Sequence, residues 1–121
     1  MSDWLFYGYS RCSTCRDALK WLGEKGVAVQ KHEIRETPPS ANELEIALNT
    51  LSGTVTKLLN TSSQDYRAMG LKDRLPLLTA EQIFALIQEN GNLCKRPFLI
   101  HTSRRTALVG FKLKQWQEFE W

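Results

Sequence analysis

Apolar positions in the first third of the chain form short runs and helically spaced sets, separated by glycines and polar clusters. Residues 4–7 are an aromatic and apolar run that ends at Gly8, which predicts a buried first strand. The next apolar residues recur at i, i+3, i+4 and i+7, as on one face of a helix: Cys15, Ala18, Leu19 and Leu22. This helix is expected to stop near residues 23–26. A second strand is then expected to begin at residues 27–29, with Ile34 as its last core residue.

Two capping boxes predict where the longer helices in the middle of the chain begin. Ser40 with Glu43 marks one start and Thr79 with Gln82 marks the other, because each pair can satisfy free N–H groups of a first helical turn. Apolar residues at helical spacing follow both starts: Leu44, Ala47, Leu48 and Leu51 in the first helix, and Ile83, Phe84, Leu86 and Ile87 in the second.

The remaining segments are shorter. Residues 53–63 predict turns packed on the core, and residues 64–69 predict a short helix that ends at Gly70. Two apolar runs, 97–100 and 107–110, are separated by a polar turn and predict a hairpin. The final helix is expected to hold Leu113, Trp116 and Phe119.

The order of these elements predicts the fold class. It is strand–helix–strand, then a helical insert, then two strands and a helix. A strand–helix–strand unit requires parallel strands, and the late hairpin adds an antiparallel pair. We therefore expect an α/β fold of the thioredoxin-like class, a four-stranded mixed sheet with helices on both faces. Residues 1–121 are expected to form this single domain, with the helical insert at about 40–91.

Length and composition are those of an ordinary globular domain. The chain has 121 residues, of which 42% are hydrophobic and 24% charged, so it can bury a core without a disulfide or metal scaffold. Its 16 basic and 13 acidic residues give a net charge of +3, too mild and too evenly spread to indicate nucleic-acid binding. The three cysteines are an odd number, which argues against a secreted disulfide framework.

Targeting patterns are missing from the sequence. The N-terminus lacks the basic stretch and apolar region of a signal peptide, and no apolar run approaches the roughly 18 residues that span a membrane. We expect a cytoplasmic protein that does not bind membranes.

The local pair Cys12 and Cys15 stands where the first predicted strand gives way to a helix. Free backbone N–H groups and the positive end of the helix dipole favour an anion there, so the pKa of Cys12 is expected to be lowered and Cys12 to be the nucleophile. Cys15, one helical turn later, is positioned to resolve a mixed disulfide. Arg11 and Arg16 flank the pair and add positive charge. Neighbouring polar residues offer hydroxyls and backbone donors to the same place: Ser10, Ser13 and Thr14.

Two other interpretations of the pair stay open. A zinc site would need two more ligands, for which Cys94 and His101 are available, although they are far from the pair in sequence. Cys15 also lies on the apolar face of its helix, so the pair could be unreactive, with Cys15 in the core. Cys94 by itself is expected to be packed.

Arg96 and Pro97 open the third predicted strand. A proline at such a position is a candidate for a cis peptide bond, which would turn the backbone towards the cysteine loop. Arg96 would then point its guanidinium at an anionic thiolate or oxyanion. The alternative is a solvated turn made of Lys95 and Arg96.

Several segments together resemble a known family. They are YGYSRCSTCR at 7–16, LLNT at 58–61, YRAMGL at 66–71, KRPFLI at 95–100 and VGF at 109–111. In this order they resemble the arsenate reductase-like family, which includes the glutaredoxin-coupled arsenate reductases and the Spx/MgsR transcription regulators. The resemblance covers nearly the whole chain. It implies a thioredoxin-like fold with a helical insert, a cis Pro97 and Cys12 as the nucleophile.

The chain departs from the arsenate reductases at two arginine positions. Those enzymes surround the oxyanion with arginines from three places, and only Arg96 stands at a matching position here, because Asn60 and Val109 occupy the other two. Losing two bidentate partners would cost a bound dianion on the order of several kcal/mol. Other arginines that could substitute are Arg67, Arg104 and Arg105. The two neutral positions count against arsenate as the substrate.

The leading hypothesis is a thiol–disulfide oxidoreductase. Cys12 attacks a disulfide or glutathione mixed disulfide, Cys15 resolves it, Arg96 stabilises the thiolate or anionic substrate, and Pro97 shapes the floor of the site. Glutathione, a glutaredoxin or a thioredoxin would supply the electrons, with no metal and no tightly bound cofactor.

The alternative is a redox-sensing regulator of the Spx type that binds the RNA polymerase alpha subunit and makes no direct contact with nucleic acid. Residues 52–54 resemble the glycine-bearing segment with which such regulators contact that subunit. A simple turn at the end of the preceding helix would explain the same glycine.

Overall fold

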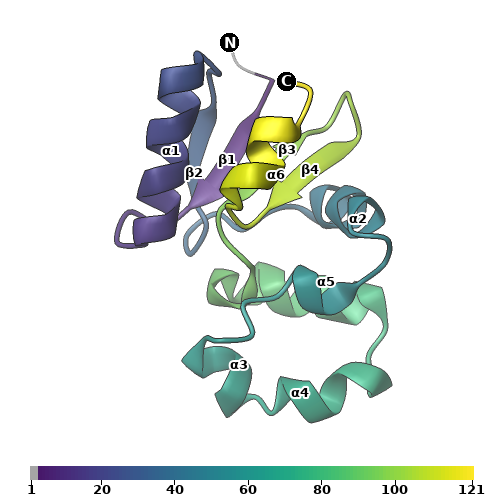
Figure 1. Cartoon of the computed structure of the whole chain (residues 1–121). Coiled ribbons are helices and arrows are strands. Elements are labelled where there is room, and N and C mark those ends of the chain that lie inside the picture. Colours follow the sequence, from purple (N-terminus) through teal and green to yellow (C-terminus); the bar gives the residue numbers. More distant parts are fainter. Residues whose placement is uncertain (1–2) are drawn as a thin grey trace.

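The molecule is built on one four-stranded sheet with helices packed around it (Figure 1). The computed structural model describes residues 3–121, so residues 1 and 2 of the expected domain lie outside the described part. The strands are β1 (Leu5–Gly8), β2 (Gln30–Glu33), β3 (Phe98–His101) and β4 (Thr106–Val109). The α-helices are α1 (Ser13–Lys25), α2 (Ala41–Thr50), α3 (Gln64–Ala68), α4 (Leu71–Arg74), α5 (Ala80–Glu89) and α6 (Leu113–Glu118). Short 3-10 helices are η1 (Val55–Lys57), η2 (Leu75–Leu77) and η3 (Gly91–Leu93).

The sheet is mixed, with the strand order β2-β1-β3-β4. Strand β1 runs parallel to β2 and antiparallel to β3, and β3 runs antiparallel to β4. Phe6 lies opposite Leu99, which in turn lies opposite Leu108, so these three side chains line one face. This is the four-stranded thioredoxin-like sheet that the sequence predicts.

Helices cover both faces of the sheet, as expected. On the face that carries Phe6, Leu99 and Leu108, α1 and α6 complete an apolar cluster. On the other face, Tyr7 and Phe98 pack with apolar residues of α2 and α5. The four tryptophans of the chain all belong to the α1 and α6 side, where Cys15 is also buried: Trp4, Trp21, Trp116 and Trp121.

The helical insert lies beyond one end of the sheet, with α2 nearest the sheet and α3 and α4 farthest from it (Figure 1). Both predicted capping boxes form. Ser40 Oγ accepts the backbone N–H of Glu43 at 3.2 Å, and Thr79 Oγ1 accepts that of Gln82 at 3.2 Å. The expected short helix ends at Gly70, whose φ of 61° is left-handed.

Three local expectations differ from the structure. Strand β2 begins at Gln30 instead of residues 27–29, because the two valines of that segment pack on the α1 side before the chain reaches β1. Helix α4 and η2 follow Gly70 directly where no helix was expected, since elements this short cannot show a helical period. Phe119 is the C-cap of α6 and not part of this helix, because its backbone is already extended, with φ of −70° and ψ of 142°.

Glu43 joins the sheet to the insert through one buried oxygen. The hydroxyl of Tyr7 donates to Glu43 Oε1 at 2.8 Å, and the backbone N–H of Ser40 donates to the same atom at 2.8 Å. Burial, together with the hydrogen bond to Glu43, raises the pKa of Tyr7 well above its usual value. One carboxylate oxygen therefore accepts hydrogen bonds from the N-cap of α2 and from the Tyr7 hydroxyl of β1.

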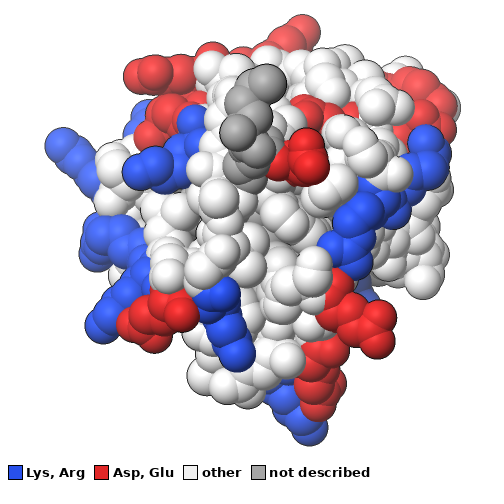
Figure 2. All heavy atoms as spheres, turned by 90° about the horizontal axis from the view of Figure 1, so that it is seen from above, with Lys and Arg blue, Asp and Glu red and all other residues white. Residues whose placement is uncertain are grey.

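Charges of both signs are interspersed on the face of the molecule that Figure 2 shows. In the view of Figure 2, Lys and Arg alternate with Asp and Glu around the margin, and the middle of this face is largely uncharged. Within residues 3–121, no helix is long and apolar enough to cross a membrane.

Replacing Glu43 by alanine is expected to destabilise the protein by about 2 to 3 kcal/mol, because it leaves the buried Tyr7 hydroxyl and a helix-capping N–H without an acceptor. Urea unfolding would measure the free energy of unfolding. Glu45→Ala is the matched control, since Glu45 lies two residues along the same helix and is exposed. Equal losses in the two variants would contradict this role of Glu43.

Candidate active site

Cys12 is the N-cap residue of α1 and lies at the end of the loop that leaves β1. Its φ of −88° and ψ of 115° are extended, and its own backbone N–H donates to the carbonyl of Tyr9 at 3.0 Å. The backbone N–H of Cys15 donates to Sγ of Cys12, with an N···S distance of 3.3 Å. The sulfur therefore takes the place of the side-chain oxygen that caps most helices. A thiolate there receives a free helical N–H group and the positive end of the helix dipole.

Arg96 supplies the positive charge that acts on this sulfur. The Arg96–Pro97 peptide bond is cis, as expected, and it lies just before β3. Arg96 is half-buried: its Nη1 donates to Oδ1 of Asn92 at 3.3 Å, and its guanidinium lies 5.1 Å from the ring centre of Tyr9. The guanidinium is held by an amide on one side and an aromatic ring on another. Arg96 is therefore not part of a solvated turn with Lys95, which was the alternative interpretation.

The two cysteines of the pair have opposite ionisation behaviour. Partial burial of Cys12 opposes ionisation, but hydrogen bonds from the thiol and the backbone N–H of Cys15, together with the charge of Arg96, outweigh it and lower the pKa of Cys12. Burial raises the pKa of Cys15 to about 12, and the hydrogen bond and charge of Cys12 act in the same direction. The pair thus consists of one accessible, acidic thiol and one buried thiol that stays protonated.

The other residues expected at the cysteine loop lie around it without touching the sulfur in any contact of the described residues. Ser10, Arg11, Ser13 and Thr14 are exposed, with the last two in the first turn of α1. Arg16 donates from Nη1 to the carbonyl of Ser10 at 2.9 Å, which ties the loop to the helix. The roles of these residues in binding remain predictions.

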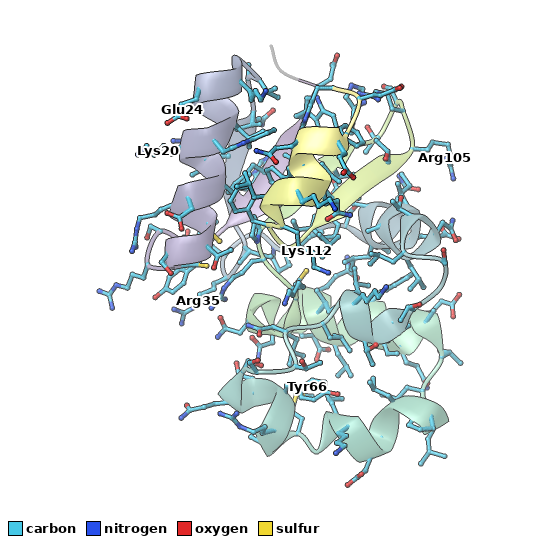
Figure 3. The ribbon with its side chains drawn as sticks, viewed as in Figure 1. Lys20, Glu24, Arg35, Tyr66, Arg105 and Lys112 are labelled. Carbon is cyan, nitrogen blue, oxygen red and sulfur yellow. The ribbon has the colours of Figure 1, made fainter. Side chains whose placement is uncertain are left out.

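Three residues at the site carried no sequence signal, namely Arg35, Asp65 and Asn92, and Tyr9 was noted only as part of the segment 7–16. They line a cavity of about 260 Å³ next to Cys12, whose walls are Tyr9, Arg35, Ser63, Gln64, Asp65, Asn92 and Arg96. The guanidinium of Arg35 lies 4.9 Å from the ring centre of Tyr9, so two arginines share this ring. Figure 3 shows Arg35 below the N-terminal end of α1. Arg35 follows β2 in a segment without a recognisable motif, and only the fold brings it near Arg96.

The arginines proposed as substitutes lie elsewhere. Arg104 donates to the carbonyls of Glu120 and Trp121 at 2.8 and 3.1 Å. Arg105 projects from the far edge of the hairpin (Figure 3). Arg67 is exposed on α3 and does not line the cavity. The second arginine of the cavity that Arg96 lines is therefore Arg35, which the sequence interpretation missed.

A second cavity, of about 230 Å³, opens beside Cys15 between α1 and β2. Phe6, Gly8 and Leu19 contribute apolar surface to it, and Arg16 and Glu33 contribute charge. Cys15 and Tyr9 are among its lining residues, and Tyr9 also lines the cavity of Arg96, so the two cavities share one wall.

Cys94 is fully buried between the insert and β3, where its backbone pairs with Leu59 in an isolated antiparallel β-bridge. Burial raises the pKa of its thiol strongly. It is packed, as expected. Within residues 3–121, no group of three or more His, Cys, Asp or Glu side chains is arranged to hold a metal ion, and so the structure offers no support for the zinc interpretation.

A model of the ArsC family matches residues 7–119, which include the cysteine pair, Arg35, Asn92 and Arg96. The chain belongs to the ArsC family. It is 37% identical over 113 residues to the uncharacterized protein YusI of Bacillus subtilis (strain 168), covering 93% of this chain and 94% of that one. It is 30% identical over 99 residues to the global transcriptional regulator Spx of Listeria innocua, covering 81% of this chain and 73% of that one.

Solved structures have the same fold as this chain. The crystal structure of a possible arsenate reductase from Streptococcus mutans UA159 superposes with a TM-score of 0.85 at 31% identity, covering 97% of this chain and 99% of that one. The proteins that this chain resembles thus include one described as a possible arsenate reductase and one described as a transcriptional regulator.

The pH dependence of Cys12 alkylation by iodoacetamide tests the ionisation behaviour. The rate follows the thiolate, so its midpoint is expected to lie below the ~8.5 of a free thiol, with Cys12 modified before Cys15 and Cys94 in peptide mapping. Arg96→Gln removes a positive charge from the sulfur, so the midpoint is expected to rise and the rate at pH 7 to fall. Arg105→Gln is the matched control and should leave the midpoint unchanged. A wild-type midpoint at or above the free-thiol value would contradict the geometry.

Proposed function

We propose that this ArsC-family protein is a thiol–disulfide oxidoreductase, with Cys12 as the nucleophile and Cys15 as the resolving thiol. The observation that supports this most directly is the asymmetry of the pair. The accessible sulfur has a lowered pKa and faces Arg96, and the sulfur one turn later is buried and protonated. An attacking thiolate and a protonated partner that reacts second are what a two-step exchange needs.

The first step is attack of the Cys12 thiolate on one sulfur of a substrate disulfide. A Cys12–substrate disulfide forms, the substrate S–S bond breaks, and the leaving thiolate takes a proton from solvent. Cys15 then loses its proton, attacks Sγ of Cys12 and releases the second substrate thiol. Two electrons pass to the substrate, and the cysteine pair becomes a disulfide. Two molecules of an external thiol such as glutathione, or one dithiol protein of the glutaredoxin or thioredoxin type, return the two electrons and leave as a disulfide.

The environment of Cys15 changes between the two steps in the direction the exchange requires. In the free enzyme the negative charge and hydrogen bond of Cys12 help to raise the pKa of Cys15. When Cys12 enters a mixed disulfide its charge disappears, and that part of the rise disappears with it. Cys15 therefore becomes easier to deprotonate only once there is a disulfide for it to attack.

Arsenate is a poor fit to the same site. Of the three arginine positions of the arsenate reductases only Arg96 is matched, and Asn60 and Val109 are neutral. Arg35 adds a second cation, but the cavity that it shares with Arg96 also contains the carboxylate of Asp65. A dianion placed there would meet a like charge, whereas the thiol exchange needs only the Cys12 thiolate to be stabilised.

Steady-state reduction of bis(2-hydroxyethyl) disulfide with glutathione as reductant tests the proposal. Wild type is expected to turn over, and Cys12→Ser to fall to the uncatalysed rate because the nucleophile is gone. Cys15→Ser is expected to accumulate a Cys12 mixed disulfide that mass spectrometry detects. Cys94→Ala, which removes the packed thiol, serves as the control and should retain turnover. Turnover by Cys12→Ser, or arsenate reduction without disulfide reduction, would contradict the proposal.

A redox-sensing regulator is the second candidate, because the chain is 30% identical to a transcriptional regulator named Spx. The turn at Ser52 and Gly53 is exposed after α2, and both residues have left-handed φ values, 57° and 77°. This turn is offered as a contact for the RNA polymerase alpha subunit. If the protein is such a regulator, pull-downs are expected to retain purified alpha subunit to a different extent with the Cys12–Cys15 disulfide than with the dithiol. Retention that does not depend on redox state, or no retention, would contradict this candidate.

A further inference from the structure

The cavity next to Cys12 presents charges of both signs to whatever enters it. Arg35 and Arg96 lie against the ring of Tyr9, with their guanidinium carbons 4.9 and 5.1 Å from its centre. The carboxylate of Asp65 lies in the same wall and has a lowered pKa, since Asn90 and Asn92 donate to it and Arg35 lies nearby. A group that carries one negative and one positive charge would find partners for both.

The orientation of Asp65 leaves one carboxylate oxygen for a ligand. Nδ2 of Asn90 and Nδ2 of Asn92 donate to Oδ2 at 3.0 and 3.1 Å. Among the hydrogen bonds of residues 3–121, none ends on Oδ1. Asn92 in turn accepts from Arg96, so the carboxylate and the guanidinium are held on opposite sides of one amide. Their spacing is therefore fixed by the fold and not by a direct ion pair.

Cys12 does not line this cavity itself, but two of the lining residues also interact with Cys12. Arg96 lines the cavity and helps to lower the pKa of Cys12. Tyr9 also lines the cavity, and its backbone carbonyl accepts the N–H of Cys12. A disulfide bonded to Cys12 can place a short substituent there. The volume of about 260 Å³ exceeds what one amino-acid headgroup occupies, so a substrate with such a headgroup has room.

We propose that this cavity is a subsite for the α-amino-acid group of a disulfide substrate, with the carboxylate bound by Arg35 and Arg96 and the ammonium bound by Asp65. The proposal rests on the oxidoreductase function and names its substrate class: disulfides of cysteine-like amino acids. The attack on the disulfide and the return of electrons are those given above, and the subsite orients the substrate without taking part in bond exchange.

Four matched disulfides separate the contributions of the two charges. Cystine carries both groups, 3,3′-dithiodipropionate lacks the ammonium, cystamine lacks the carboxylate, and bis(2-hydroxyethyl) disulfide lacks both. Because each lost charge-assisted hydrogen bond costs roughly tenfold or more, kcat/KM is expected to be highest for cystine and at least about tenfold lower for each analogue. Glutathione disulfide, whose amino-acid group is separated from sulfur by an amide, shows whether the headgroup must be adjacent to sulfur. Values for all five within about twofold of one another would overturn the proposal.

Two variants assign the charges to residues. Arg35→Gln is expected to lower kcat/KM for cystine and dithiodipropionate by roughly tenfold relative to cystamine. Asp65→Asn keeps an acceptor for Asn92, and it is expected to lower kcat/KM for cystine and cystamine relative to dithiodipropionate. The pH midpoint of Cys12 alkylation should stay in place in both, since neither charge lowers the pKa of Cys12. Arg105→Gln is the control for loss of a cation. A uniform fall across substrates in either variant would contradict the assignment.

A binding readout keeps the subsite testable without turnover. S-methyl-L-cysteine cannot exchange, and it is expected to slow the reaction of Cys12 with iodoacetamide. 3-(Methylthio)propionate and 2-(methylthio)ethylamine, which lack one charge each, should need about tenfold higher concentrations. Turnover of no disulfide together with this protection would contradict the oxidoreductase and keep the subsite. Turnover of all disulfides without protection or charge preference would contradict the subsite and keep the oxidoreductase.

Discussion

The antiparallel pairing of β1 with β3 determines where the sulfur of Cys12 lies relative to Arg96. Tyr7 stands opposite Phe98, so the chain that leaves β1 at Gly8 lies beside the chain that enters β3 at Pro97. The loop to Cys12 and the residue before Pro97 therefore meet because main-chain hydrogen bonds require it. A slip of one residue would turn the alternate side chains of β3 to the wrong faces and also move Arg96 relative to the sulfur. The sheet core and the chemistry of the site thus depend on one register.

The asymmetry of the cysteine pair follows from the way α1 begins. An N-cap residue is outside the helix, half in solvent, and receives an N–H from one turn later, whereas the third residue of the helix faces the core. Placing cysteines at these two positions gives one acidic and one buried thiol without any special charged group on the helix. Arg96, which precedes β3, lowers the pKa of Cys12 further. Arg35 lines the neighbouring cavity and is not among the groups that shift this pKa.

Local patterns in the sequence predicted most of the fold and half of the site. Cys12, Cys15, Arg96 and the cis Pro97 carry visible signals, since a cysteine pair at a helix start and a proline opening a strand each have a local physical reason. Arg35 and Asn92 do not, because their importance comes from tertiary proximity to Tyr9 and Arg96. The short helices after Gly70 were missed for a different reason: a single turn contains too few residues to show a period.

The tryptophans have a consequence for observing the molecule. All four lie on the α1 and α6 side of the sheet, in the cluster that also contains Cys15, while residues 40–91 contain Tyr66 but no tryptophan. Tryptophan fluorescence therefore reports on the side of the domain that contains Cys15 and does not report directly on the helical insert. A disulfide quenches nearby excited indoles by accepting an electron, so closure of Cys12 with Cys15 is expected to dim this emission. Tryptophan fluorescence would then follow the proposed redox change of the pair without an added label.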